Sequence, residues 1–205
     1  MWEHLGVCRV WEIANIGIYL DTTALNGLRK YRRSGKVQFN GLDAFAMAVL
    51  PDRGIVQAME KGRLRVRGFN ASNLTPNGYD LTIAEVVILL TEPMTVKEGM
   101  ALVPPHARFA VSTVEVVELG NDIAAQLWLR TTWARRGVLA SFGKVDAGFR
   151  GTLTLAAFNA NPVDLEIPIG EKFAQIVFED LSGPAEKPYE ERSGHWQDQS
   201  GARLK

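Results

Sequence analysis

The sequence has a single cysteine, Cys8, and only three histidines among its 205 residues. One cysteine excludes an intramolecular disulfide framework and a cysteine-rich zinc site. Because a chain without disulfides fits a reducing compartment, we expect a cytoplasmic protein. The longest apolar runs, such as residues 86–90, are far shorter than the roughly 20 residues of a membrane-spanning helix. We therefore expect no membrane association.

Neither sign of charge is in excess, since 23 Lys and Arg residues balance 23 Asp and Glu residues. Proteins that bind nucleic acid through its phosphate backbone normally carry a basic surplus, so we expect no nucleic-acid partner. Hydrophobic residues make up 46% of the chain and charged residues 22%, as in ordinary globular proteins. The length allows one domain with a sizeable core and a short appendage.

Several common catalytic motifs are missing. The sequence has no G-x-x-x-x-G-K-[ST] loop, no G-x-G-x-x-G, no H-E-x-x-H and no G-x-S-x-G. The three histidines are scattered, and no paired cysteines accompany them, so a zinc-dependent deaminase site cannot be built. Hydrolysis or deamination would have to depend on carboxylates, water, basic side chains and a magnesium ion carried by the substrate.

The chain divides near residue 47. Residues 1–46 form an N-terminal extension that ends in a cluster of five basic residues between positions 29 and 36. The cluster has two interpretations: a patch for nucleic acid or targeting, or a solvated leader or translated upstream sequence. The second is favoured because five charges alone specify little, and because Met47 begins a coherent domain.

Residues 47–181 have the pattern of a β domain with one short N-terminal helix. Asp52 is a candidate helix cap, Ile55, Val56 and Met59 share one face, and Gly62 ends the helix. Apolar and alternating segments then predict strands around residues 64–66, 86–90, 152–155 and 163–167. Frequent Pro and Gly turn signals favour a β-barrel or sandwich. Residues 182–205 are polar, and we expect a mobile tail unless a ligand orders it.

Three segments concentrate polar residues among apolar neighbours: 77–81, 130–137 and 143–151. The second combines hydroxyls with guanidinium groups, a combination suited to phosphate oxygens. The third places one acid, Asp146, between glycines and beside Phe149, where backbone can approach a ligand and a ring can stack on it. Each feature alone is weak, because an Asp in a Gly-rich turn is usually turn chemistry.

Together and in order, these segments resemble the motifs of the trimeric dUTPase and dCTP deaminase superfamily. The resemblance covers about residues 48–201, with motif-like segments at 77–81, 130–132, 143–151 and 170–175 and a deaminase-like ending at 196–201. It implies an all-β, dUTPase-like β-barrel or jelly-roll subunit. It also implies a homotrimer with its sites at subunit interfaces.

The residue that separates the two activities is Ala156. In deaminases of this superfamily, a glutamate on the strand after the third motif acts as general acid and base, and alanine here cannot carry a proton. Gly143 also matches the glycine that dUTPases have before the third motif. The resemblance therefore favours a dUTPase with deaminase-like ends. The alternatives are a dCTP deaminase, mono- or bifunctional, with Glu166 as first substitute for the glutamate, or a regulatory module that binds nucleotide without turnover.

The favoured resemblance implies hydrolysis of dUTP to dUMP and pyrophosphate. Asp146 would activate the attacking water, and Phe149 would stack on the deoxyribose. Mg²⁺ would be bound to the triphosphate and would meet the protein at Asp80 through water. The residues implied in substrate binding are Arg130, Thr131, Arg135, Gly143, Lys144, Phe149, Gln175 and Gln199.

Overall fold

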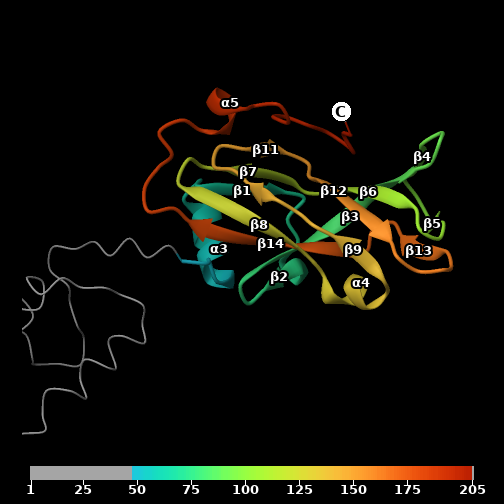
Figure 1. The fold of residues 1–205 in the computed structure, drawn as a ribbon. Coiled ribbons are helices and arrows are strands. Elements are labelled where there is room, and N and C mark those ends of the chain that lie inside the picture. Colours follow the sequence, from blue (N-terminus) through green and yellow to red (C-terminus); the bar gives the residue numbers. More distant parts are fainter. Residues whose placement is uncertain (1–47, 205) are drawn as a thin grey trace, which may run out of the picture. The chain divides into compact units, whose positions relative to one another are not determined.

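A computed structural model describes residues 48–204 of the chain (Figure 1). The N-terminal extension of residues 1–46, with its basic cluster, lies outside the described residues. The described part consists mainly of antiparallel β-strands, which confirms the predicted all-β class. The helices are short: one precedes all the described strands in the chain, one follows them all, and a 3₁₀ turn and one further helix lie between strands (Figure 1).

The strands are β1 (Leu64–Arg67), β2 (Leu74–Thr75), β3 (Gly78–Leu89), β4 (Met94–Val96), β5 (Met100–Val103), β6 (Arg108–Thr113), β7 (Val116–Leu119), β8 (Ile123–Leu129), β9 (Val138–Ala140), β10 (Lys144–Val145), β11 (Arg150–Gly151), β12 (Thr154–Asn159), β13 (Leu165–Pro168) and β14 (Lys172–Asp180). The helices are α3 (Asp52–Glu60), the 3₁₀ turn η2 (Ala71–Asn73), α4 (Thr131–Arg135) and α5 (Tyr189–Arg192). Helices α4 and α5 were not predicted from the sequence, since each is little more than one turn.

Helix α3 is the predicted N-terminal helix. It buries Ile55 fully and Ala58 almost fully, and Gly62 follows its end with a φ of +69°. The prediction that Asp52 caps the helix was wrong. Pro51 is the N-cap residue, and Asp52 is the first helical residue, whose carboxylate accepts a hydrogen bond only from the adjacent Arg53 N–H at 2.7 Å. Proline suits this place because its missing N–H would have no partner inside the helix.

The long strand β3 joins the two halves of the main sheet. Its first half, near Tyr79–Thr82, pairs with β14, and its second half, from Ile83 to Leu89, pairs with β6. The strand order of the main sheet is β10-β8-β14-β3-β6-β12-β9. A register shift between Ile83 and Glu85 lies where β3 changes partner. Such an irregularity bends a strand and lets one sheet curl.

Alternation along the strands puts the core on one face of this curled sheet. In β13 the order is buried, exposed, buried, as predicted for residues 163–167, although the strand begins only at Leu165. An aromatic cluster fills the region under β14, where Phe173 is fully buried and contacts the rings of Phe109, Trp133 and Phe142 at centroid distances of 5.6–6.4 Å.

A buried carboxylate fixes the backbone of β3 near Asp80. Glu115 is 1% exposed and accepts hydrogen bonds from the N–H and the hydroxyl of Thr82, each at 2.9 Å. The Tyr79 hydroxyl also donates to it at 3.4 Å, and burial raises the pKa of this phenol above its ordinary value. Because buried polar groups need such partners, these contacts hold the segment on both sides of Asp80 in place.

Candidate functional site

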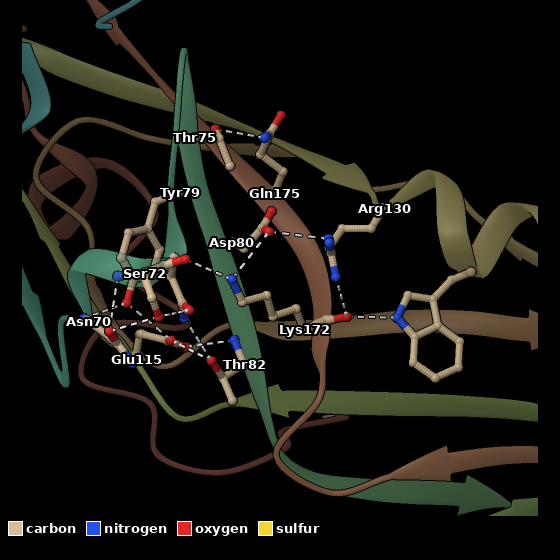
Figure 2. Close-up of polar contacts among 12 residues, drawn as sticks. Asn70, Ser72, Thr75, Tyr79, Asp80, Thr82, Glu115, Arg130, Lys172 and Gln175 are labelled. Carbon is tan, nitrogen blue, oxygen red and sulfur yellow. Dashed lines mark hydrogen bonds and ion pairs between the residues drawn. The ribbon is translucent and has the colours of Figure 1, made fainter. Parts of the chain in front are cut away.

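Asp80 lies at the centre of a charged cluster on the outer face of the sheet (Figure 2). Its carboxylate is 8% exposed, and its Oδ2 atom is 3.2 Å from Arg130 Nε and 3.9 Å from Lys172 Nζ. The side chains of Arg130 and Lys172 are each about one third exposed. The first, second and fourth motif-like segments therefore meet through their charged residues within one subunit.

The turn that carries Arg130 is anchored to β14 by three hydrogen bonds. The Arg130 N–H donates to the Phe173 carbonyl at 3.1 Å, and both Trp133 Nε1 and Arg130 Nη1 donate to the Lys172 carbonyl, at 2.8 and 3.4 Å. The guanidinium of Arg136 covers the Trp133 ring at 4.5 Å from its centroid. Thr131 and Arg135 belong to α4 and are exposed. Helix α4 thus presents the Thr131 and Arg135 side chains to solvent directly after Arg130, which pairs with Asp80.

Gln175 stands between Asp80 and an exposed tryptophan. It is the register partner of Asp80 in β3 and of Trp128 in β8, so the three side chains share one face. The Gln175 amide donates to the Thr75 hydroxyl at 2.9 Å (Figure 2). Trp128 is 59% exposed, an unusual position for so large an apolar ring, and it extends this polar row with a flat surface.

Gly143 and Lys144 line a cavity of about 370 Å³ next to Trp128. The cavity lies between β8 and the segment that connects β9 with β10, with Phe142 also in its wall. Lys144 is 3.5 Å from the Glu179 carboxylate. This volume falls within the range of small-molecule pockets. The pocket places two predicted binding residues next to the face that holds Gln175.

Asp146 lies in the turn between β10 and β11. The Phe149 N–H donates to the Asp146 carbonyl at 3.1 Å, and Gly148 has a φ of +83°, a conformation that strongly favours glycine. The side chain of Asp146 is exposed, and the hydrogen bonds and ion pairs among residues 48–204 do not include it. An exposed carboxylate at the tip of a rigid turn is accessible to a ligand and to water.

Phe149 is only 5% exposed because the C-terminal segment covers it. The Tyr189 ring meets it edge to face at 5.6 Å, and the Tyr189 N–H donates to the Ala147 carbonyl at 2.9 Å. In this arrangement Phe149 presents no open ring face to a sugar. The expected stacking on deoxyribose requires that residues 188–189 move away.

The C-terminal segment continues along β11 toward β12 (Figure 1). Gln199 is 7% exposed and forms a parallel bridge with Gly151, and its amide donates to the Thr152 carbonyl. The Arg150 guanidinium donates to both carboxylate oxygens of Asp198. This contact lowers the pKa of Asp198 and raises the pKa of Arg150. Gln199, predicted to bind substrate, thus contacts its own subunit here.

Asp146 and the Asp80 cluster do not meet within one subunit. Val145 pairs with Ala125 in β8, whereas the row of Asp80 and Gln175 reaches β8 at Trp128. About three strand spacings across the sheet and about four residues along β8 separate the two positions, a distance on the order of 20 Å. Within one subunit, Asp146 is therefore too far from the Asp80 cluster to contact the same phosphate group.

Ala156 lies on the outer face of β12. Its side chain is exposed, and its neighbours Leu155 and Ala157 are buried. Its register partner in β6 is Ala110, which is followed across the sheet by Val87 of β3. Three apolar side chains thus occupy this row of the sheet, and none of them can transfer a proton.

Lys172, Trp133 and Trp128 were not singled out from the sequence. Lys172 and Trp133 belong to the quoted motif-like segments, but their roles depend on contacts between residues about 40 or more positions apart. Trp128 precedes the second segment by two residues, and only an alternation count along β8 would have placed it on the outer face.

Comparison with known proteins gives the family. A sequence model described as dCTP deaminase-like matches residues 49–181. A dCTP deaminase of Thermococcus kodakarensis is 37% identical over 142 residues, which cover 69% of this chain and 88% of that protein. A protein of Sulfolobus islandicus rod-shaped virus 1, named as a probable deoxyuridine 5′-triphosphate nucleotidohydrolase, is 32% identical over 157 residues, 76% of this chain and 97% of that one.

The fold agrees with this relationship. The crystal structure of a 2′-deoxycytidine 5′-triphosphate deaminase from Agrobacterium tumefaciens superposes with a TM-score of 0.57 at 17% identity, over 65% of this chain and 48% of that chain. Among residues 48–204, no helix has the length and apolar character needed to cross a membrane. The sequence matches and the motif-like segments that the fold brings together lead to one conclusion: this chain belongs to the dCTP deaminase-like family, within the dUTPase and dCTP deaminase superfamily.

Proposed function

We propose that this protein is a dUTP diphosphatase, which hydrolyses dUTP to dUMP and pyrophosphate. The observation that carries the proposal is Ala156, an exposed alanine where deaminases of the superfamily have their catalytic glutamate. Deamination needs a group at that place to move protons between water and the cytosine ring, whereas phosphate hydrolysis does not. The acid that hydrolysis needs, Asp146, is present and exposed.

In the proposed reaction, the Asp146 carboxylate accepts a proton from a water molecule. The water oxygen forms a bond to the α-phosphorus, the bond from the α-phosphorus to the α,β-bridging oxygen breaks, and pyrophosphate leaves with that electron pair. A carboxylate is a weak base, so positioning and charge neutralisation must lower most of the barrier. The charged and polar groups available for this are Arg130, Lys172 and Gln175.

Magnesium bound to the triphosphate would neutralise phosphate charge in this reaction. Asp80, the residue expected to meet the ion through water, already has two cationic neighbours within 4 Å. These surroundings do not fit a protein-held metal ion at Asp80. The proposal therefore includes magnesium that is bound to the triphosphate. The groups of the protein that bind the phosphates are the cations around Asp80.

The distance between Asp146 and Arg130 supports a site shared by two subunits of a homotrimer. We predict that two inactive variants, Asp146→Asn and Arg130→Gln, regain activity when they are unfolded together and reassembled as mixed trimers. Random mixing places an intact Asp146 opposite an intact Arg130 at about a quarter of the interfaces. Hydrolysis assays on the mixed and the separately refolded proteins measure the recovery. A mixture as inactive as its components would contradict a shared site.

The second candidate function is dCTP deamination, because most relatives similar in sequence bear that name. It would need a substitute proton carrier. Glu166, the first substitute considered from the sequence, lies in β13, which pairs only with β5 in a separate two-stranded sheet. It is therefore not on a strand paired with β12, which carries Ala156, and the fold gives this alternative less support than the names do.

Product analysis separates these functions. Purified protein with magnesium is given dUTP and dCTP in separate reactions, and dUMP, pyrophosphate and ammonia are measured. We expect dUMP and pyrophosphate from dUTP, and no ammonia from dCTP. Ammonia release from dCTP would identify a deaminase, with pyrophosphate in the same reaction marking a bifunctional one. Binding of either nucleotide without any product would identify a regulatory module.

A further inference from the structure

The Asp80 cluster contains one carboxylate and two cations, and so carries a net charge of +1. Asp80 is nearly buried, whereas Arg130 and Lys172 are about one third exposed and reach solvent beside it (Figure 2). Lys172 Nζ also donates to the Ser72 carbonyl at 2.9 Å, and Arg130 Nη1 to the Lys172 carbonyl at 3.4 Å. The carboxylate and two backbone carbonyls together fix both cationic side chains.

A magnesium ion binds best to a carboxylate whose negative charge is not already neutralised. At Asp80 the charge is compensated on two sides, and a divalent ion, even one bound through water, would be repelled by both cations. A triphosphate, in contrast, is attracted to this cluster. Its two positive groups are held at a fixed spacing by a carboxylate that is itself shielded from solvent.

We propose that Asp80 is a positioning residue that holds Arg130 and Lys172 as a pair of triphosphate ligands, and that Lys172 is a phosphate-binding residue of the site. Asp80 acts through these two cations and makes no contact with the metal. Nζ of Lys172 can donate to a phosphate while it keeps its bond to Ser72, because an ammonium group has three donors. The inference rests on the proposed function only in taking a deoxynucleoside triphosphate as the ligand.

The sign of one effect distinguishes this role from metal binding. Removal of a negative charge next to a polyanion should by itself strengthen binding when no metal is present. If Asp80 positions the cations, its removal has the opposite effect, because Arg130 and Lys172 then repel each other and lose their common anchor. The affinity of Asp80→Asn for nucleotide in the absence of magnesium therefore tests the proposal directly.

The experiment measures binding of the non-hydrolysable α,β-imido analogue of dUTP by calorimetry, once in EDTA and once in excess magnesium. For Asp80→Asn we expect an affinity about tenfold or more below that of the wild type in EDTA. The ratio of the affinities with and without magnesium should stay at its wild-type value. Lys172→Met should weaken binding similarly, and the double variant should lose less than the two single losses combined.

The matched control is Glu85→Gln, which removes another buried carboxylate of β3 that pairs with a lysine, Lys97, at 3.3 Å. It should bind the analogue as the wild type does. If Glu85→Gln and Asp80→Asn lowered the affinity for the analogue equally, the loss would come from structural damage, and the proposal would be overturned. Unchanged affinity of Asp80→Asn in EDTA, with loss of the magnesium effect, would make Asp80 a metal ligand and also overturn it.

Because binding is measured apart from turnover, the two proposals can fail separately. A protein that binds the analogue as described but does not hydrolyse dUTP would overturn the proposed function and support the role of Asp80. A wild-type protein that binds neither the dUTP analogue nor dCTP would overturn both.

Discussion

Replacement of Asp146 by asparagine should reduce the rate of dUTP hydrolysis by about 10²–10⁴-fold, the usual contribution of a general base. Asparagine keeps the size and the hydrogen-bonding reach of the side chain but cannot accept a proton at neutral pH. Since Asp146 is exposed and has no ion pair with another residue of 48–204, the change should leave the folded state intact. Single-turnover assays and thermal unfolding of the same samples measure both effects.

Asp164→Asn is the matched control for this prediction. Asp164 is also an exposed acid, in the loop before β13, but it lies outside the motif-like segments. We expect hydrolysis by Asp164→Asn at the wild-type rate. Substrate binding should survive in Asp146→Asn, so its loss should appear in kcat with little change in the affinity for the dUTP analogue. Hydrolysis at more than a tenth of the wild-type rate would show that another group activates the water.

Much of the fold could be predicted from the sequence because β-strands have recognisable local sequence patterns. The alternation in residues 163–167 and the turn residues between segments depend on neighbours in the chain, and they gave the all-β class. The bounds were less accurate. Strand β3 spans Gly78–Leu89, although only 86–90 was predicted, because its first half pairs with β14 almost 100 residues later.

The candidate site was predictable as a set of segments but not as a set of contacts. Asp80, Arg130 and Gln175 were named from their segments, and the fold brings them to one face. The place of Lys172 in that cluster depends on the pairing of β3 with β14, which no local pattern encodes. The same holds for Phe149, whose ring is covered by Tyr189 from a tail that was expected to be mobile.

The separation of Asp146 from Arg130 also could not be predicted from local sequence patterns. Both residues occur in adjacent segments of the chain, 16 positions apart, yet α4, β9 and β10 lie between them and carry the chain to another part of the sheet. Order along the chain does not reveal this separation, which follows from the strand order, and the separation agrees with the sites at subunit interfaces that the resemblance implies. The mixed-trimer prediction depends on it.

Replacement of Phe173 by alanine should lower the free energy of unfolding by about 3–5 kcal/mol, the usual cost of removing a fully buried phenyl ring. Phe173 is 0% exposed, and its ring contacts those of Phe109, Trp133 and Phe142, so the cavity cannot close without moving the other rings. Urea unfolding at fixed protein concentration measures the loss, since dissociation of an oligomer would otherwise contribute to it.

This core position also supports the site. Trp133 packs on Phe173 and donates to the Lys172 carbonyl, and the Phe173 carbonyl accepts from the Arg130 N–H. Because both cations of the Asp80 cluster depend on this segment, Phe173→Ala should weaken nucleotide binding under conditions in which the protein is still folded. Phe158→Ala is the control, since Phe158 is partly exposed on β12 and should cost less than half as much stability. Two results would show that the aromatic cluster does not hold Arg130 and Lys172 in place. One is a decrease of less than about 1 kcal/mol in the free energy of unfolding of Phe173→Ala, and the other is unchanged nucleotide binding by a variant that has lost the full amount of about 3–5 kcal/mol.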